Sequence, residues 1–408
     1  MFRILLLIFS SISTLTFAGG FDSSGRPFDI IFGEENELAL SFSYLSPSVD
    51  LSVSRNQGDG LGLPSQDVSE ITNDYFEPRV ALRLIVNDQV NCAAQLERPF
   101  RFKTRYPDDK LTYLRDEDQA NSQVVAPLES EYSSESLTVA CSIRYDIDHE
   151  SELFDKSFFT LIAGPKLQQV EGTFSSDLTE QDLGSFDNYR AELEGKREWG
   201  YMLGLAYEIP ALALQASLFF HNEIHHDLSG TATAPSPDLS TTVSESVKSA
   251  TVTPRALNFR LQSGIVENWL AFLELRWGDW SSVDELYVEA GDLSQELELF
   301  KNDTLNYKLG LGTQVSDRLS LGAYFESVID LNPPSTPKGV DGTNLRNPQC
   351  KRYSVAFGGK YLLTSKLSVG LGASYYYISR GRFADSAYTV DLDRSQALAV
   401  AGNLNYRF

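Results

Sequence analysis

The connections between alternating segments are the feature that most limits what this chain can fold into. From residue 37 to the last residue, segments with apolar side chains at every second position recur, which is the periodicity of a β-strand with two different faces. Their connections alternate between turns of about two to five residues and polar loops of about twenty or thirty, a pattern typical of membrane barrels. A soluble sandwich has no reason to sort its loops in this way.

The segments also have a length suited to crossing a membrane, since a tilted strand needs about 9 to 11 residues. They number about fourteen, and bacterial single-chain barrels require an even number. The predicted strands are 37–46, 76–86, 90 to about 103, 137–147, 158–170, 196–208, 211–221, 254–265, 269–277, 304–315, 319–328, 351–362, 367–378 and 396–408. We therefore predict an all-β fold, a transmembrane antiparallel β-barrel with a short N-terminal plug segment.

The last segment reads QALAVAGNLNYRF, with apolar residues on one face and small or polar residues on the other. Its aromatic end, Tyr406 and Phe408, resembles the ends of bacterial outer-membrane barrels, which implies that the barrel assembly machinery reads these residues. We expect the segment to pair with 37–46, because closure leaves no unpaired edge in the membrane. Asn403, Asn405 and Arg407 would then face the lumen. The predicted location is the outer membrane of a Gram-negative bacterium.

The beginning of the chain predicts export. Arg3 precedes a short apolar run, and small-residue spacing follows at Thr16 and Ala18, as in a secretory signal peptide. The run is shorter than the ~18 residues of a transmembrane helix. Residues 19–33 have neither strand nor helix periodicity. We expect a signal peptide at 1–18, an N-terminal hatch or plug segment at 19–36 and the barrel at 37–408.

The charge of the chain limits its partners. It has 56 acidic and 34 basic residues, for a net charge of -22, and neutralising nucleic-acid phosphates needs clustered Lys and Arg. We therefore expect no nucleic acid. Much of the acid lies in predicted loops, where it could share divalent cations with lipopolysaccharide or simply be solvated. Outer-membrane lipid and lipopolysaccharide are the expected surroundings.

Three cysteines, Cys92, Cys141 and Cys350, are an odd number for an exported protein. Cys92 and Cys141 fall on neighbouring predicted strands and on the lipid face. A cross-strand disulfide requires their Cα atoms to lie within about 7 Å. The sequence leaves that pairing open.

The histidines do not predict a metal site or an enzyme. On a regular strand His221, Glu223 and His225 would share one face, but same-face positions are about 7 Å apart along a strand, so the three cannot all reach one ion. No GxSxG motif is present to seat a nucleophile. We expect no catalytic residue, no metal and no cofactor.

Charges and apolar residues both point into the predicted lumen. Arg79 and Arg83 must face inward, because a cation on the lipid side near the midplane costs about 2 to 4 kcal/mol. Inward aromatic residues such as Phe219 and Phe272 suit an amphipathic solute better than a sugar or an ion. Glycines at 310, 312, 370 and 372 are expected to make room inside the barrel. Pro99 cannot donate a ladder hydrogen bond, so we expect a break or bulge there.

The sequence resembles the long-chain fatty acid outer-membrane transporters, the FadL and TodX type. The resemblance rests on GFDSSGRPFDIIFGEENELALSFSYLSPSV from Gly20, on GLAYEIPALALQASLFFHNEIHHDL and TPRALNFRLQSGI, and most specifically on LELRWGDWSSV at 273–283. It implies a monomeric fourteen-stranded barrel, plugged by a small hatch, that passively takes up long-chain fatty acids or related hydrophobic compounds. The solute would enter between long loops and leave sideways through a kink in the third strand.

The resemblance also suggests roles for particular residues. The hatch would include Phe21, Arg26, Phe28 and Phe32, although the Asn-Pro-Ala motif of well-known members is absent. Pro99 and Phe100 would form the kink and lateral gate. We predict Arg79 and Arg83 as carboxylate partners and Phe100 as a further substrate contact, since Arg binds a carboxylate with a bidentate fork. The alternative is a structural or adhesive surface barrel that acts through its long acidic loops.

Overall fold

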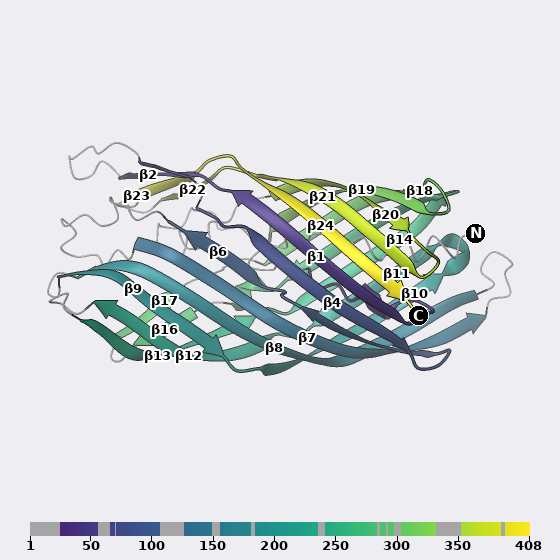
Figure 1. Ribbon diagram of the computed structural model, residues 1–408, viewed down its shortest axis with the longest axis horizontal. Coiled ribbons are helices and arrows are strands. Elements are labelled where there is room, and N and C mark those ends of the chain that lie inside the picture. Colours follow the sequence, from purple (N-terminus) through teal and green to yellow (C-terminus); the bar gives the residue numbers. More distant parts are fainter. Residues whose placement is uncertain are drawn as a thin grey trace.

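The strands close into a single antiparallel barrel in a computed structural model of the chain (Figure 1). The structure describes residues 25–55, 66–69, 71–106, 126–148, 156–180, 184–235, 241–283, 286–290, 293–297, 303–331, 352–384 and 388–408. The predicted signal peptide, Phe21, His149 and Cys350 lie outside these ranges. No helix within them is long and apolar enough to cross a membrane.

Fourteen antiparallel segments surround the lumen, which confirms the predicted fold class. We call each of these segments a wall and number the walls from the N-terminus. Several walls consist of two strands separated by a short irregularity. In order around the barrel they are β1 (Glu37–Ser48), β4 (Tyr75–Ile85), β5 (Val90–Glu97) with β6 (Arg101–Arg105), β7 (Ala126–Asp148), β8 (Lys156–Glu180), β9 (Gly184–Gly195) with β10 (Glu198–Ile209), β11 (Leu214–His221) with β12 (Ile224–Pro235), β13 (Thr242–Thr253) with β14 (Ala256–Val266), β15 (Trp269–Gly278) with β16 (Leu286–Ala290), β17 (Leu293–Leu297) with β18 (Thr304–Gln314), β19 (Leu319–Asp330), β20 (Arg352–Leu362), β21 (Leu367–Ile378) and β24 (Ser395–Arg407).

The last strand closes the barrel as predicted. β24 pairs with β1 along its length, from Glu37 opposite Arg407 to Ser48 opposite Gln396. Leu398, Val400 and Tyr406 are exposed on the outer face of β24. Closure satisfies the backbone groups of both strands, which is the requirement for strands in lipid.

The two ends of the barrel differ. Short turns such as 86–89, 315–318 and 363–366 lie at one end together with the C-terminus, which we call the turn end. At the opposite, loop end a separate four-stranded sheet forms from β2 (Leu51–Arg55), β3 (Gln66–Val68), β22 (Gly381–Ala384) and β23 (Tyr388–Leu392) (Figure 1). Its short strands were not predicted.

Several walls extend further toward the loop end than the sequence indicated. β7 and β8 have 23 and 25 residues, and β9, β12 and β13 occupy stretches that we predicted to be loops. The outward face of β7 changes from apolar at Leu137 to acidic at Glu135. The hydrogen-bonded ladder thus continues beyond the apolar band, where outward residues no longer need to be apolar, so the alternation signal is lost.

The barrel wall contains one disulfide among the described residues. Cys92 on β5 and Cys141 on β7 are directly opposite in the register, with Cα atoms 4.0 Å apart. This is close to the spacing of a non-hydrogen-bonded pair in an antiparallel ladder. The structure thus settles the pairing that the sequence left open.

Candidate functional site

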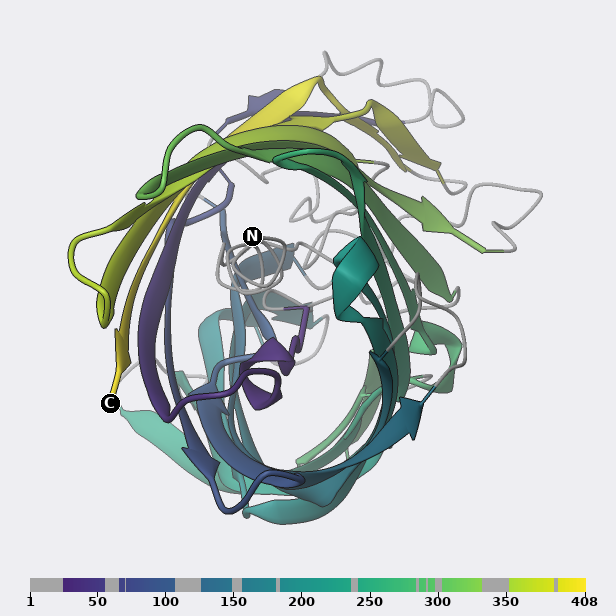
Figure 2. The same cartoon turned by 90° about the vertical axis from the view of Figure 1, so that its right-hand side faces the viewer.

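Residues 25–36 lie inside the turn end of the barrel, where the end-on view shows them within the ring of strands (Figure 2). They include the short 3-10 helix η1 (Asp29–Ile31). Phe28 and Ile31 pack against the inner wall, with Phe219 and Met202 among their neighbours. This apolar contact fixes one side of the segment.

Polar side chains of the wall hold the other side through the backbone of the segment. Arg83 donates to the carbonyl oxygens of Ile30 at 2.9 Å, Phe32, and Glu35 at 2.8 Å, and its guanidinium pairs with Glu37 at 3.0 Å. Arg83 is almost fully buried. Because the whole guanidinium fork is engaged, Arg83 binds the segment in this structure.

Two further amides and one glycine complete this docking. Asn91 donates to the carbonyl of Gly33 at 3.0 Å, and Gln95 donates to that of Pro27 at 2.8 Å. Gly33 has φ +140°, and a Cβ there would lie 2.5 Å from the Arg83 guanidinium. A side chain at position 33 would therefore displace the arginine.

A buried ion-pair chain crosses the same half of the lumen. Asp29 pairs with Arg260, which lies 3.5 Å from Glu274, and Glu274 lies 3.3 Å from Lys308. Burial raises the pKa of the Asp29 carboxyl, and the Arg260 charge acts in the opposite direction. Arg260 and Lys308 are thus each paired with an acid, and the sequence did not identify Asp29 as one of these acids.

A cavity of about 140 Å³ lies between the segment and the wall. Its lining combines apolar groups of the segment with arginines of β4 and β14. Arg79 and Arg83 border it together with Ile30, Phe32, Phe219 and Arg260. The structure thus brings both predicted arginines to one cavity, where Arg79 lies 3.3 Å from Glu97.

The lumen toward the loop end has a different lining. A cluster of buried apolar side chains, which we call the upper cluster, covers it; its members are Phe100, Phe102, Tyr132, Val170, Phe174, Ala191, Leu193, Leu228, Ala232, Val247, Trp280 and Val283. Phe102 stacks on Tyr132, and Trp280 meets Phe100 edge-on, each pair with ring centroids 6.0 Å apart. Non-directional apolar surface of this kind can contact many hydrophobic solutes.

Trp280 reaches the upper cluster from η6 (Trp280–Ser282), which interrupts the wall between β15 and β16. A Cβ at Gly278 would lie 2.9 Å from the indole nitrogen of Trp280, so a small residue is needed there. Asp279, between them, pairs with Arg255. Sequence reasoning missed the lumenal position of Trp280, although it belongs to the 273–283 stretch that carried the resemblance.

Arg26 lies at the boundary between the two halves of the lumen. Its guanidinium packs over the Phe100 ring at 5.0 Å, a cation–π distance, and donates to the carbonyl of Pro254 at 3.0 Å. Burial lowers the pKa of Arg26 to about 10, so it remains charged at neutral pH, and Glu97 opposes the shift. Phe100 therefore contacts both Arg26 and the upper cluster.

Lys166 also points into the lumen at this boundary and is almost fully buried. Its charged neighbours are Arg26 and Glu97. Across the described ranges, no carboxylate lies within ion-pair distance of the Lys166 ammonium. A buried cation without a close counterion is costly, which makes Lys166 a candidate for binding an anionic group.

The histidines correct one expectation from the sequence. His221 and His226 are buried in the lumen, whereas the side chain of His225 is 75% exposed on the outside. The irregularity at Asn222 and Glu223, between β11 and β12, shifts the alternation. His221 and His225 therefore do not share a face, and no metal-binding cluster occurs within the described ranges.

The third wall is interrupted between Glu97 and Arg101, a stretch that includes Pro99 and Phe100. β5 pairs with both β4 and β7, whereas β6 pairs in the ladder with β7. The β4–β5 pairing stops at Val80 opposite Leu96, and β4 and β6 share no ladder pairing. This leaves a window in the wall, which we define as the space between 76–79 and 97–103.

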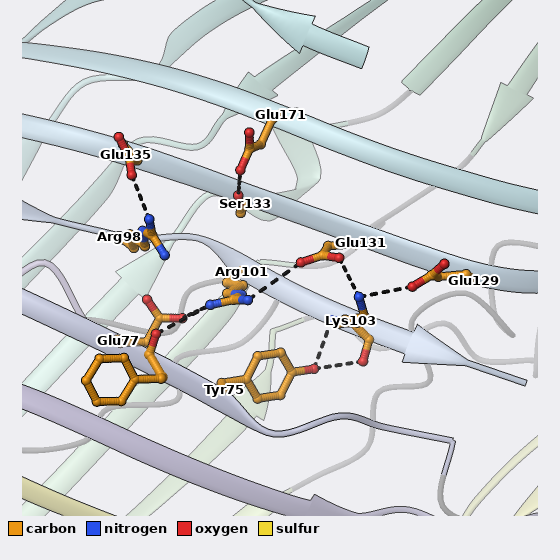
Figure 3. Close-up of polar contacts among 11 residues, drawn as sticks. Tyr75, Glu77, Arg98, Arg101, Lys103, Glu129, Glu131, Ser133, Glu135 and Glu171 are labelled. Carbon is orange, nitrogen blue, oxygen red and sulfur yellow. Dashed lines mark hydrogen bonds and ion pairs between the residues drawn. The ribbon is translucent and has the colours of Figure 1, made fainter. Parts of the chain in front are cut away.

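Side chains close the window where the backbone ladder does not (Figure 3). The Tyr75 hydroxyl bonds to both backbone groups of Lys103, at 2.9 and 3.0 Å. An isolated bridge between Thr72 and Thr104 lies beyond it. Within the window, Arg101 donates to the carbonyl of Phe76 at 3.4 Å.

The sequence and the fold are both similar to those of known proteins. A family model described as "Outer membrane protein transport protein (OMPP1/FadL/TodX)" matches residues 24–408. No curated protein sequence matches the chain significantly.

Among solved structures, a Pseudomonas aeruginosa FadL homologue matches with a TM-score of 0.71 at 14% identity, covering 96% of each chain. The Pseudomonas putida toluene transporter TodX matches with a TM-score of 0.60 at 15% identity, again covering 96% of each chain. The monoaromatic hydrocarbon channel CymD matches with a TM-score of 0.53 at 13% identity, covering 92% of this chain and 89% of that one. At these identities the solved structures support the fold.

Proposed function

Because the chain belongs to the outer membrane protein transport protein family (OMPP1/FadL/TodX), we propose that it passively carries long-chain fatty acids or related amphiphiles from the upper cluster to the window in the third wall. The family consists of channels for hydrophobic compounds in Gram-negative outer membranes. The protein is accordingly a transport channel and not an enzyme.

The contact of the upper cluster with the window carries this proposal. Phe100 belongs both to the cluster and to the interrupted stretch. A hydrophobic solute can therefore keep apolar contact from the loop end of the lumen to the window. A straight path through the turn end would instead have to displace residues 25–36, which are held by Arg83, Asn91 and Gln95.

A charged layer beside this path favours amphiphiles over pure hydrocarbons. Lys166 lies at the boundary, and Arg79 borders the cavity below it. We assign the carboxylate of a fatty acid to Lys166, with Arg79 as a second cation and Phe100 as the first tail contact. Arg83 remains a predicted carboxylate partner, but its donors are engaged by the N-terminal segment.

Residues 25–36 act as the hatch in this proposal, with Phe28 and Phe32 as its apolar anchors and Arg26 as its link to Phe100. Tyr406 and Phe408 serve as the assembly signal. Toluene and other monoaromatic compounds, named for TodX and CymD, are the second substrate class, and the aromatic rings of the upper cluster favour them.

Uptake by cells that lack their own transporter tests the proposal. Cells expressing the protein should take up labelled oleate faster than cells with an empty vector, and Phe100→Ala together with Trp280→Ala should remove most of that gain. Tyr201→Ala is the control, because Tyr201 is exposed on the outer face. Unchanged uptake in the double variant would favour the structural or adhesive alternative, in which the loops matter and the lumen does not.

A further inference from the structure

The two edges of the window present different chemistry to the outside. On β4 the outward residues Phe76 and Val80 are 52% and 41% exposed. Phe76 stacks on Phe42 of β1 with ring centroids 6.0 Å apart. This edge of the window is an apolar surface that can hold an acyl chain.

The opposite edge is charged. Lys103 of β6 lies 3.0 Å from Glu129 and 2.6 Å from Glu131 of β7, and Arg98 lies 2.8 Å from Glu135 (Figure 3). The outward face of β7 turns from apolar to acidic between Leu137 and Glu135. This edge therefore lies where the apolar band of the barrel ends, at the level expected for lipid headgroups.

Arg101 crosses from the charged edge to the inside of the window. One guanidinium nitrogen is 3.6 Å from Glu131 on the outer face, and another is 3.7 Å from Glu77, which points inward from β4. Both distances exceed hydrogen-bonding distance, so the guanidinium makes no bidentate hydrogen bond with either acid. Both Glu77 carboxylate oxygens are buried and have no hydrogen-bond partner in the described part of the chain.

We propose that Arg101 is a headgroup-recognising latch, which makes the window selective for amphiphiles with an anionic head. In the observed state Arg101 spans the window between Glu77 and Glu131. An anionic head arriving from the lumen offers the guanidinium the bidentate acceptor that Glu77 does not provide at 3.7 Å. The head displaces Glu77 while the tail lies along the Phe42 and Phe76 edge.

A neutral hydrophobic solute cannot compete for Arg101, so it gains nothing from the latch. This inference rests on the proposed function, because it assumes that solutes leave through the window. It adds a specificity that the apolar path alone does not have, since the upper cluster contacts charged and neutral amphiphiles alike.

Two probes with the same tail test the latch, labelled oleate and labelled oleyl alcohol. Initial uptake rates are measured in cells expressing the wild type, Arg101→Gln, Arg101→Lys or Arg190→Gln. Arg190 of β9 is the matched control, because it belongs to the same outward charged surface but its ion-pair partners among the described residues are Glu192 and Glu129, and neither Glu77 nor Glu131. Uptake rates are normalised to the amount of folded barrel, which is measured from the gel band that shifts when the sample is heated.

We expect Arg101→Gln to lower oleate uptake about tenfold, as for the loss of one charge-assisted hydrogen bond, and to leave uptake of the alcohol within about twofold of the wild type. Arg101→Lys should restore part of the oleate rate, and Arg190→Gln should change neither rate.

Equal losses for both probes, or no loss for oleate, would overturn the latch while the proposed function stands. If wild-type cells took up neither probe faster than the empty vector, the proposed function would itself be wrong.

Discussion

The two halves of the lumen are enclosed by one barrel but hold their contents in different ways. Toward the turn end, Arg83, Asn91 and Gln95 bind backbone carbonyl oxygens of residues 25–36. Toward the loop end, the upper cluster offers apolar surface without such directed groups. Directed hydrogen bonds fix one segment in one position, whereas apolar contact tolerates solutes of different shape. The turn end therefore holds residues 25–36 permanently, whereas the loop end can bind and release a solute.

The largest expected effect comes from releasing residues 25–36 from the turn end of the lumen. Arg83→Ala removes three donors to the segment and leaves Glu37 as a buried acid without this partner, and breaking a buried pair typically costs about 3–5 kcal/mol. The segment should then leave its position, and single-channel ion conductance in planar bilayers should rise. Arg83→Lys keeps the charge but loses the fork, so it should open the channel less. Wild-type conductance in Arg83→Ala would mean that this contact does not hold the segment.

The second prediction removes the centre of the upper cluster. Trp280→Ala should lower uptake of both oleate and toluene several-fold at equal amounts of folded protein, because it removes a large apolar side chain that both solutes would contact. Trp199→Ala is the matched control, since Trp199 is exposed on the outer face. If the two variants transported equally well, the upper cluster would not be the path.

The third prediction concerns the boundary between the halves. Lys166→Gln should weaken binding of a fluorescent fatty acid to the purified barrel about tenfold, since hydrogen bonds to charged groups contribute about 1.5–3 kcal/mol. Binding of the matching alcohol should not change. Lys248→Gln, an exposed substitution on β13, is the control for net charge. An equal loss for acid and alcohol would assign Lys166 a structural role.

The smallest effect on transport is expected from the disulfide. Replacing Cys92 and Cys141 by Ser should lower the free energy of unfolding by up to about 2–4 kcal/mol, the range typical of disulfides. The β5–β7 ladder remains, so the window should keep its shape and oleate uptake should stay at the wild-type rate. Reduced uptake at equal amounts of folded protein would show that the window depends on this link.

The barrel was predictable because contact with lipid requires an apolar side chain at every second residue of a strand. Leu398, Val400 and Tyr406 on the last strand follow that rule and are exposed in the structure. Beyond the apolar band the outward residues no longer alternate in this way, and the strands there were not predicted. β12 and β13 are rich in Ser and Thr beyond the apolar band, and the irregularity at Asn222 reversed the expected facing of His225.

The site was only partly predictable, because its geometry depends on contacts between distant parts of the chain. Arg79 and Arg83 were found through the cost of charge in lipid. The engagement of Arg83 by the carbonyls of residues 25–36 could not be read from either stretch alone. Likewise Trp280 meets Phe100 because η6 folds inward beside Gly278, and no periodicity marks such a turn.

Photo-crosslinking can show whether a fatty acid passes from the upper cluster to the window. A fatty acid with a photoreactive group along its tail is bound to the purified barrel, irradiated, and its attachment sites are mapped by mass spectrometry. We expect labels on Phe100, Phe102 and Trp280 in the lumen and on Phe76 outside the window. Labels confined to the loops, or to Phe32 and Phe219 at the turn end, would contradict it.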